Sequence, residues 1–378
     1  MAGSSWDLIV VGAGPAGAAA ALEARRLAPG ARVLLLDRAD FPRDKACGDG
    51  IGPHAVAELA ELGAESVLDG YPPIHRLRLR APGGIDLAGT CERASRVVPR
   101  KVLDARLVEL AVAAGAELRR VRVQELERRD GQVVVNGELA APAVVGADGA
   151  NSTVRRLLGV PASPARRTAI ALRGYAPAPP GPAEQLIGWV AEGWPAYVWS
   201  FPTGTGLVNV GYGLLRSRLR GGRAELERRL RDLLPGVEPD PASLRAHHLP
   251  FSPSRPLAGH GRVLLCGDAA SMVNPLSGEG IYYALASGRL AARAGLLAPE
   301  RPAAAYQAML HELLGRHFRH AALLGLAIRW QPLARAALAG AAGSPARFQQ
   351  LVDLGLGQAR ITPSLLAGVT SGLRAGRR

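Results

Sequence analysis

The sequence Leu8-Ile-Val-Val-Gly-Ala-Gly-Pro-Ala-Gly17 predicts a buried β-strand that turns through three glycines into a helix. A fully apolar strand of this length is typical of a parallel sheet that is covered on both faces. In the GxGxxG spacing, Gly12 permits the tight turn and Gly14 lets the backbone approach a pyrophosphate, while Gly17 lets helix and strand pack closely. The helix start, which includes Ala16, presents free N–H groups to phosphates. This stretch therefore predicts a dinucleotide site.

A second strand and an acidic residue complete a βαβ unit. The helix is expected to stop at Pro29-Gly30, and Arg32-Val-Leu-Leu-Leu-Asp37 reads as the next strand. Asp37 follows Gly17 by 20 residues, which is the usual place for an acid that binds ribose hydroxyls, and Arg38 comes next. Because strand, turn, helix, strand and acid appear in order, the pattern favours a bound dinucleotide over a glycine-rich turn without a ligand.

Two later segments distinguish FAD from NAD. The stretch Gly146-Ala-Asp-Gly-Ala-Asn-Ser-Thr-Val-Arg-Arg156 resembles the second flavin motif of aromatic hydroxylase-like flavoproteins, and Cys266-Gly-Asp-Ala-Ala270 with Gly278-Glu-Gly-Ile281 resembles their third. We expect the helix that starts near Gly278 to point its N–H groups at the flavin ring, where reduced flavin gains negative charge. No second GxGxxG is visible, so we predict no separate NAD(P)H domain. The resemblance implies FAD contacts from Asp148, Gly149, Gly267, Asp268, Gly278, Gly280 and Ile281.

Arg100 precedes a helix that the sequence predicts over residues 102–114. An arginine at this place often contacts FAD in the superfamily, and an ordinary surface arginine is the alternative. Asp268, at the end of a strand, is expected to accept a hydrogen bond from the ribityl chain. Asp49 and Glu279 are expected to be a solvated loop residue and a helix cap rather than catalytic acids.

An aromatic strand lies between the flavin motifs. In Tyr197-Val-Trp-Ser-Phe-Pro202, residues two apart share one face, so Tyr197, Trp199 and Phe201 are expected to form an aromatic wall. Such a wall suits an apolar chain, because each buried methylene contributes about 0.8 kcal/mol. The alternative is that the rings are ordinary core of a sheet.

This strand and a cysteine loop resemble the geranylgeranyl reductase family, flavoenzymes that saturate C=C bonds of isoprenoid chains. The first match is Tyr197 to Pro202 followed by Gly211-Tyr-Gly213, and the second is Lys45-Ala-Cys-Gly-Asp-Gly50. With the flavin motifs, the resemblance covers residues 7 to about 298. It implies that Cys47, Tyr197 and Trp199 act in catalysis, and that Cys47 and Gly48 lie near FAD. The implied substrate-binding residues are Gly50, Tyr197, Trp199, Phe201, Pro275, Gly211 and Gly213.

The expected activity is hydride transfer from reduced FAD to an isoprenoid alkene, with a proton from Cys47, a tyrosine or water. The electron donor is NAD(P)H or a reduced electron carrier. An FAD-dependent monooxygenase of the aromatic hydroxylase type is the main alternative, and a non-catalytic prenyl-lipid carrier is another. Flavin halogenases have a related tryptophan motif, but neither Lys45 nor Lys101 is convincingly placed as a halogenase lysine.

The predicted fold is α/β: a discontinuous Rossmann-like FAD-binding domain, an inserted antiparallel β-sheet substrate domain and a C-terminal helical region. We assign residues 1–75, 96–160 and 256–298 to the first, 76–95 and 161–255 to the second, and 299–378 to the third. Residues 117–146 read as hairpin material with a turn at Asp130-Gly131. Helices after residue 302 are expected to be interrupted at Pro332, Pro345 and Pro363.

Composition bounds the partners. The 378 residues have a net charge of +14, but only two basic residues are lysines, a skew that fits a GC-rich coding bias. No basic run is interleaved with aromatics, so we predict no nucleic-acid partner and no metal site. Three dispersed cysteines indicate a reducing cytoplasm. Peripheral membrane contact through the arginine-bearing segment Arg316 to Arg335, or an electron-transfer partner, is compatible with the basic surface; a helical cap on the core is the alternative to membrane contact.

Overall fold

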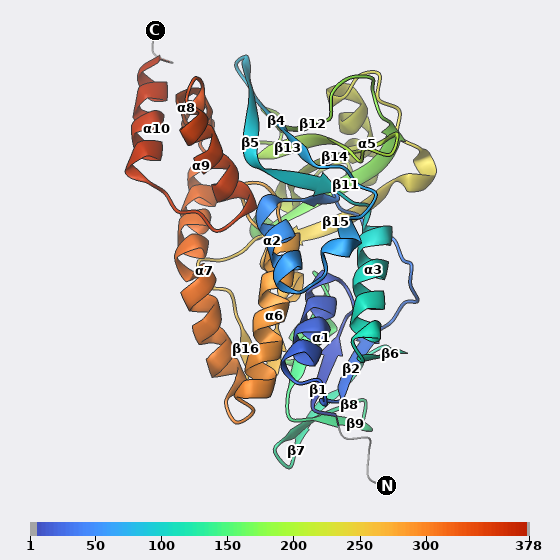
Figure 1. Ribbon diagram of the computed structural model, residues 1–378. Coiled ribbons are helices and arrows are strands. Elements are labelled where there is room, and N and C mark those ends of the chain that lie inside the picture. Colours follow the sequence, from blue (N-terminus) through green and yellow to red (C-terminus); the bar gives the residue numbers. More distant parts are fainter. Residues whose placement is uncertain (1–5, 376–378) are drawn as a thin grey trace.

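The computed structural model describes residues 6–375 and contains a six-stranded sheet at the N-terminal end (Figure 1). All neighbouring strands are parallel except β16 with β17. Chain order reverses at β1, which has β2 on one side and β10 on the other, and ligands bind at such a switch point beside the carboxyl ends of the strands. The strand order is β16 (Gly259–His260), β17 (Val263–Leu265), β10 (Val144–Gly146), β1 (Leu8–Val11), β2 (Val33–Asp37) and β6 (Glu117–Arg120).

Helix α1 (Pro15–Leu27) packs closely against two neighbouring helices. It contacts both α3 (Arg100–Ala113) and α6 (Ile281–Leu297). A Cβ at Gly288 of α6 would lie 2.0 Å from the Ala16 carbonyl oxygen of α1, so the absence of a side chain permits the close approach. The short helix α4 (Thr153–Leu157) follows β10.

The segment 117–146 only partly forms the expected hairpin. Strands β7 (Leu126–Arg129), β8 (Gln132–Val135) and β9 (Leu139–Ala141) make a separate three-stranded sheet. Asp130 and Gly131 both have positive φ, as a two-residue type I′ turn requires. The segment's outer strands, β6 and β10, instead join the parallel sheet, because β10 is fully buried and pairs with β1.

The second large sheet has eight strands and is antiparallel apart from the β12–β4 pair. This confirms the predicted antiparallel substrate sheet, while the exact domain boundaries stay a prediction. Its strand order is β15 (Arg245–Pro250), β11 (Thr168–Pro177), β14 (Leu207–Leu215), β13 (Ala196–Pro202), β12 (Glu184–Val190), β4 (Ile74–Ala81), β5 (Ile85–Val97) and β3 (Gly50–Ile51).

A helix that the sequence analysis did not anticipate covers one face of this sheet. In α5 (Gly222–Leu233), Leu226 and Leu230 are buried one turn apart and pack into a core with Val208 and Val210 of β14. This leaves the other face of β13 and β14 for the cavity described below.

The C-terminal helices cap the antiparallel sheet, as Figure 1 shows in orange and red. Leu338 and Phe348 share a core with Leu77 and Leu79 of β4. Pro332, Pro345 and Pro363 each stand in the first turn of a helix, where a proline loses no hydrogen bond. No helix within residues 6–375 has the length and apolarity needed to cross a membrane. The remaining helices are α2 (Pro53–Glu61), α7 (Pro302–Ala327), α8 (Gln331–Ala341), α9 (Pro345–Leu356) and α10 (Pro363–Ala375).

Candidate active site

A cavity of about 1010 Å³ is lined by residues of both large sheets. Its volume is at the upper end of the range for small-molecule sites. One end contains the glycine turn after β1, and the other contains the aromatic strand β13 and Leu356 of α9. The predicted site residues that line it are Gly12, Gly14, Ala16, Asp37, Arg38, Cys47, Gly48, Gly50, Arg100, Asp148, Gly149, Tyr197, Trp199, Phe201, Asp268, Gly278, Gly280 and Ile281.

The glycine turn fits a dinucleotide. Gly12 has φ +99°, and a Cβ there would lie 2.5 Å from the Ala147 carbonyl oxygen. Gly14 is the N-cap of α1 and makes no side-chain cap hydrogen bond, so backbone N–H groups of the first turn are available to a phosphate. Asp37 accepts a hydrogen bond from the Ala13 backbone N–H at 2.8 Å and stands at the carboxyl end of β2. These residues are those that would hold the pyrophosphate and ribose of FAD.

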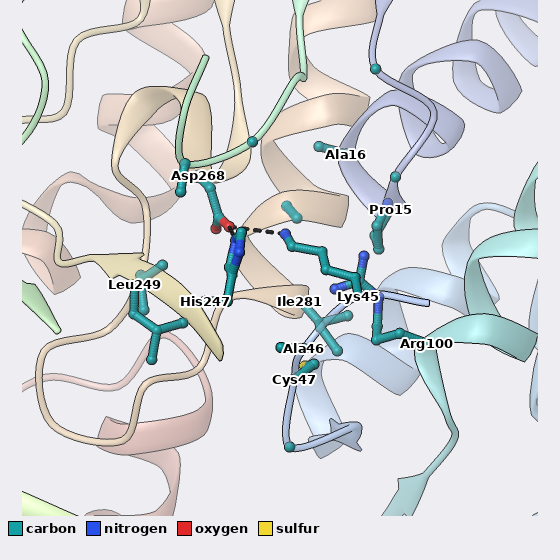
Figure 2. Close-up of a pocket in the computed structure, with 18 of the residues that line it drawn as sticks. Pro15, Ala16, Lys45, Ala46, Cys47, Arg100, His247, Leu249, Asp268 and Ile281 are labelled. Atoms are coloured by element: carbon teal, nitrogen blue, oxygen red, sulfur yellow. Dashed lines mark hydrogen bonds and ion pairs between the residues drawn. The ribbon is translucent and has the colours of Figure 1, made fainter. Parts of the chain in front are cut away.

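An ionic cluster of Lys45, His247 and Asp268 lies near Ile281 at the N-terminal end of α6 (Figure 2). Lys45 Nζ lies 3.1 Å from Asp268 Oδ2, and His247 Nε2 lies 4.0 Å from the same oxygen. Burial and the neighbouring Lys45 lower the pKa of His247 to about 3, so its ring is neutral at physiological pH. Burial opposes the charged form of Asp268, but the charge and hydrogen bond of Lys45 hold the pKa of this carboxyl below its ordinary value. The acceptor predicted for the ribityl chain is therefore ionised and shared with Lys45.

Glu279 and Asp148 both cap helices at the cavity wall. Glu279 Oε1 accepts a hydrogen bond from the Tyr282 backbone N–H at 2.8 Å, which confirms the expected helix-cap position. Burial raises the pKa of Glu279 to about 7. Asp148 Oδ2 accepts from the Thr153 and Val154 backbone N–H groups at the start of α4. Both side chains thus fix the second and third flavin-like motifs to the helices that follow them.

Arg100 is buried, so the surface alternative for this residue is wrong. Its Nε and Nη2 lie 2.5 and 2.7 Å from the two carboxylate oxygens of Asp104, one turn along α3. Arg43 Nη1 lies 3.3 Å from the same carboxylate and Arg43 Nη2 lies 3.3 Å from Asp37. Two cations therefore stand beside the glycine turn, where a pyrophosphate would carry negative charge.

The aromatic wall has the geometry that the period of two predicts. Tyr197, Trp199 and Phe201 all line the cavity, while Val198 points into the core under α5. The rings of Tyr197 and Trp199 lie 5.7 Å apart between centroids. Trp199 Nε1 donates to Asn209 Oδ1 at 2.8 Å, which fixes the indole in place.

Five other predicted residues do not line the cavity. Gly211 and Gly213 pair with Trp199 and Tyr197 on the next strand and lie under the two rings. A Cβ at Gly211 would lie 2.0 Å from Trp199 Cζ2, and one at Gly213 would lie 3.0 Å from Tyr197 Cζ. These glycines therefore position the wall instead of touching a ligand. Gly17 packs on Gly12, Gly267 on Ala16, and Pro275 near Gly325 of α7.

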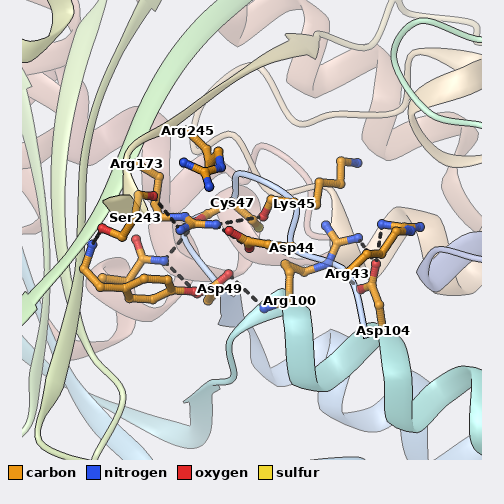
Figure 3. A network of polar contacts seen from close by, with 12 residues as sticks. Arg43, Asp44, Lys45, Cys47, Asp49, Arg100, Asp104, Arg173, Ser243 and Arg245 are labelled. Atoms are coloured by element: carbon orange, nitrogen blue, oxygen red, sulfur yellow. Dashed lines mark hydrogen bonds and ion pairs between the residues drawn. The ribbon is translucent and has the colours of Figure 1, made fainter. Parts of the chain in front are cut away.

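The Cys47 loop is held by residues from distant strands (Figure 3). Arg173 of β11 donates to Asp44 at 2.6 Å and to the Lys45 carbonyl oxygen at 3.2 Å. Asn209 of β14 donates from Nδ2 to the Cys47 carbonyl oxygen at 2.9 Å. The half-buried thiol of Cys47 lines the cavity, and burial raises its pKa. The loop is thus anchored by the antiparallel sheet, although in sequence it follows β2.

Asp49 is buried, so the expectation of a solvated loop residue is wrong. It has φ +61° and accepts hydrogen bonds from Tyr175 Oη and, at 2.7 Å, from Asn209 Nδ2. Its Oδ1 also accepts from the Arg100 backbone N–H at 3.3 Å. Burial raises the pKa of Asp49 to about 6. This carboxyl ties the cysteine loop to the antiparallel sheet and to the start of α3.

Sequence reasoning missed the residues that anchor the loop, Arg173, Tyr175 and Asn209, and it missed His247, which lies beside Asp268. Each stands on a strand where alternation alone predicts a cavity-facing or core position, and no local motif marks it. The available signal was a polar residue in an otherwise apolar strand, as Asn209 is between Val208 and Val210.

Comparisons with known proteins agree with this geometry. The FAD binding domain family matches residues 5–179. The chain is 39% identical to a menaquinone reductase of Mycolicibacterium smegmatis over 309 residues, 76% of this chain and 75% of that protein. It is 32% identical to digeranylgeranylglycerophospholipid reductase 2 of Methanopyrus kandleri over 347 residues, 84% and 85% of the two chains.

A solved structure has the same fold along almost the whole chain. It is a geranylgeranyl bacteriochlorophyll reductase-like protein of Thermoplasma acidophilum, with a TM-score of 0.79 and 20% sequence identity. The alignment covers 98% of this chain and 96% of that one. This likeness shows that both large sheets and the C-terminal helices form one recurring architecture.

Proposed function

Since this chain belongs to the geranylgeranyl reductase family of FAD-dependent oxidoreductases, we propose that it saturates C=C bonds in the isoprenoid chain of a lipid such as a menaquinone or a geranylgeranyl lipid. One observation supports this most directly: the aromatic wall of β13 lines the same cavity as the glycine turn after β1. An apolar chain on that wall would lie beside the cofactor.

Bound FAD supplies a two-electron reductant that delivers hydride to carbon. The protein must hold an unconjugated alkene close to that reductant and exclude water. Tyr197, Trp199 and Phe201 offer apolar area for the chain, with about 0.8 kcal/mol for each buried methylene. A Cβ at Gly48 would lie 3.3 Å from both Trp199 Nε1 and Phe201 Cε2, so only a glycine leaves that space open.

Two side chains are suited to donate the proton. Burial raises the pKa of the Cys47 thiol, and burial also raises the pKa of the Tyr197 hydroxyl well above its ordinary value. Both Cys47 Sγ and Tyr197 Oη therefore keep their protons at neutral pH, and both line the cavity. Trp199, locked by Asn209, would orient the alkene between them. The reductant of FAD is NAD(P)H or a reduced electron carrier.

The test uses purified protein with bound FAD, reduced by dithionite without oxygen and mixed with a menaquinone or a geranylgeranyl phospholipid. Mass spectrometry should find a product that has gained two hydrogens per reduced bond. Tyr197→Phe and Cys47→Ala should each be tested for product formation by the reduced protein, and the variant that keeps bound flavin but loses product would identify the proton donor. A product that has instead gained an oxygen in aerated buffer would indicate a monooxygenase. Protein that is colourless and takes up no flavin would overturn the proposal.

A further inference from the structure

One face of α7 is apolar where it meets solvent. Leu323 and Leu326 of α7, and Trp330 three residues beyond its last residue Ala327, are 60%, 61% and 58% exposed, which is unusual for large apolar side chains so close together. Arg316 and Arg319 precede them on the same face at helical spacing and are also exposed. We call these five residues the α7 outer face.

The opposite side of the same helix is an ordinary core surface. Leu314, His317, Phe318 and Ala321 are buried, and α7 packs along α6. The helix therefore packs on the core through its inner side, and its outer leucines are exposed. Figure 1 shows α7 along one flank of the molecule, with α8, α9 and α10 at its C-terminal end.

The charge around this face is one-sided. Between Glu312 and Asp353 the sequence has no acidic residue but five arginines. Cations beside exposed leucines and a tryptophan are the combination that binds an anionic lipid surface, because arginines meet headgroups and the indole lies at the interface. Three large apolar side chains are, in contrast, too few for the roughly 800 Å² per partner of a stable protein–protein interface.

The face also lies close to the site. Trp194, just before β13, donates from Nε1 to the Ile328 carbonyl oxygen at 2.6 Å, so the end of α7 is tied to the substrate sheet. Gly325, on the inner side of α7, faces Pro275, whose side chain would lie 2.8 Å from a Cβ at that glycine. Pro275 lies two residues before the loop from Ser277 to Gly280 that lines the cavity.

From these observations we infer that the α7 outer face docks the enzyme on an anionic bilayer, with Leu323, Leu326 and Trp330 entering the headgroup region. The choice of partner rests on the proposed function, since a polyprenyl lipid resides in a membrane. Docking would place the substrate end of the enzyme beside the lipid from which the chain must be taken. The bilayer is recognised by its anionic headgroups and not by a specific lipid.

The test is flotation of the full protein with vesicles, which reads binding without reference to turnover. Wild-type protein should float with vesicles of phosphatidylglycerol and phosphatidylcholine, and much less with phosphatidylcholine alone or in high salt. The double substitution Leu323→Asp with Trp330→Asp should weaken binding at least about tenfold. Arg316→Gln with Arg319→Gln should weaken it several-fold and reduce the salt dependence.

A matched control comes from Leu297, the last residue of α6, which is 62% exposed and lies outside the α7 outer face. Leu297→Asp should leave flotation unchanged. Turnover of a detergent-solubilised substrate by the Leu323→Asp/Trp330→Asp variant should equal that of wild type, which also shows that the variant folds. The inference would be overturned if the Leu323→Asp/Trp330→Asp variant floated as well as the Leu297→Asp variant. It would also be overturned if wild type were a dimer in light scattering and the Leu323→Asp/Trp330→Asp substitution made it a monomer. Failure of the proposed function would appear differently, as normal flotation without product.

Discussion

The two ends of the cavity are built in opposite ways. At the glycine turn, the motif that defines the site lies between Gly12 and Asp37, and its contacts depend on backbone approach, including that of Gly12 to Ala147. At the cysteine loop, the contacts join residues 126 to 162 positions apart and depend on buried side chains. The first end is therefore specified by local spacing, whereas the second exists only after both sheets have formed.

The largest expected effect is at the glycine turn. A Cβ at Gly17 would lie 1.7 Å from the Gly12 carbonyl oxygen, so Gly17→Ala must displace the turn itself. We expect the free energy of unfolding to fall by more than about 3 kcal/mol and bound flavin to be lost. Gly30→Ala is the control, because no atom lies within 4 Å of that position. Absorbance of the purified protein and denaturant unfolding measure both effects; a yellow, stable Gly17→Ala variant would contradict the local character of this end.

The second prediction concerns the glycines under the aromatic wall, where the substrate end also depends on a close backbone approach. Gly211→Ala would put a Cβ 2.0 Å from Trp199 Cζ2 and 2.5 Å from the Leu172 carbonyl oxygen, whereas Gly213→Ala would meet Tyr197 at 3.0 Å. We expect destabilisation of about 3 kcal/mol for the first and about 1 kcal/mol for the second. Both variants should keep flavin and raise KM for the lipid. Equal unfolding free energies in the two variants would argue against a wall supported by Gly211.

The buried carboxyl at the cysteine loop should make stability depend on pH. Burial raises the pKa of Asp49 to about 6, above its value in the unfolded chain, so the folded protein holds this proton more tightly. The stability from Asp49 is therefore complete below about pH 4 and is lost as pH rises through about 6. Between pH 4 and 7, wild type should lose about 2 to 3 kcal/mol relative to Asp49→Asn, measured by urea unfolding. Parallel pH profiles of the two proteins would refute the assignment.

The smallest effect is the link between Asn209 and the aromatic wall. Trp199→Phe removes the indole N–H that Asn209 Oδ1 accepts. In a double-mutant cycle with Asn209→Ala, the coupling free energy should be about 1 kcal/mol. A cycle that pairs Asn209→Ala with Phe201→Leu is the control, because no hydrogen bond joins those two residues within the described part of the chain. Additivity in the first cycle would mean that the network does not orient Trp199.

The same contrast explains what could be predicted from sequence. The parallel sheet, the flavin-like motifs and the shared face of Tyr197, Trp199 and Phe201 follow from periodicity and spacing, and the structure has all three. The burial of Asp49 could not be predicted, because its partners Tyr175 and Asn209 come from other strands. Strand β6 was misassigned for a similar reason: its neighbour β2 lies about 80 residues earlier in the chain.

The anchoring of the cysteine loop limits how such enzymes can be recombined. An engineer who exchanged the antiparallel sheet for that of a relative, to change which lipid is accepted, would remove Arg173, Tyr175 and Asn209 together. The loop left behind would have lost its supports and would no longer be held against the new wall. A working chimaera would have to transfer residues 41–52 along with the sheet, so the unit of inheritance for substrate choice is not contiguous in the gene.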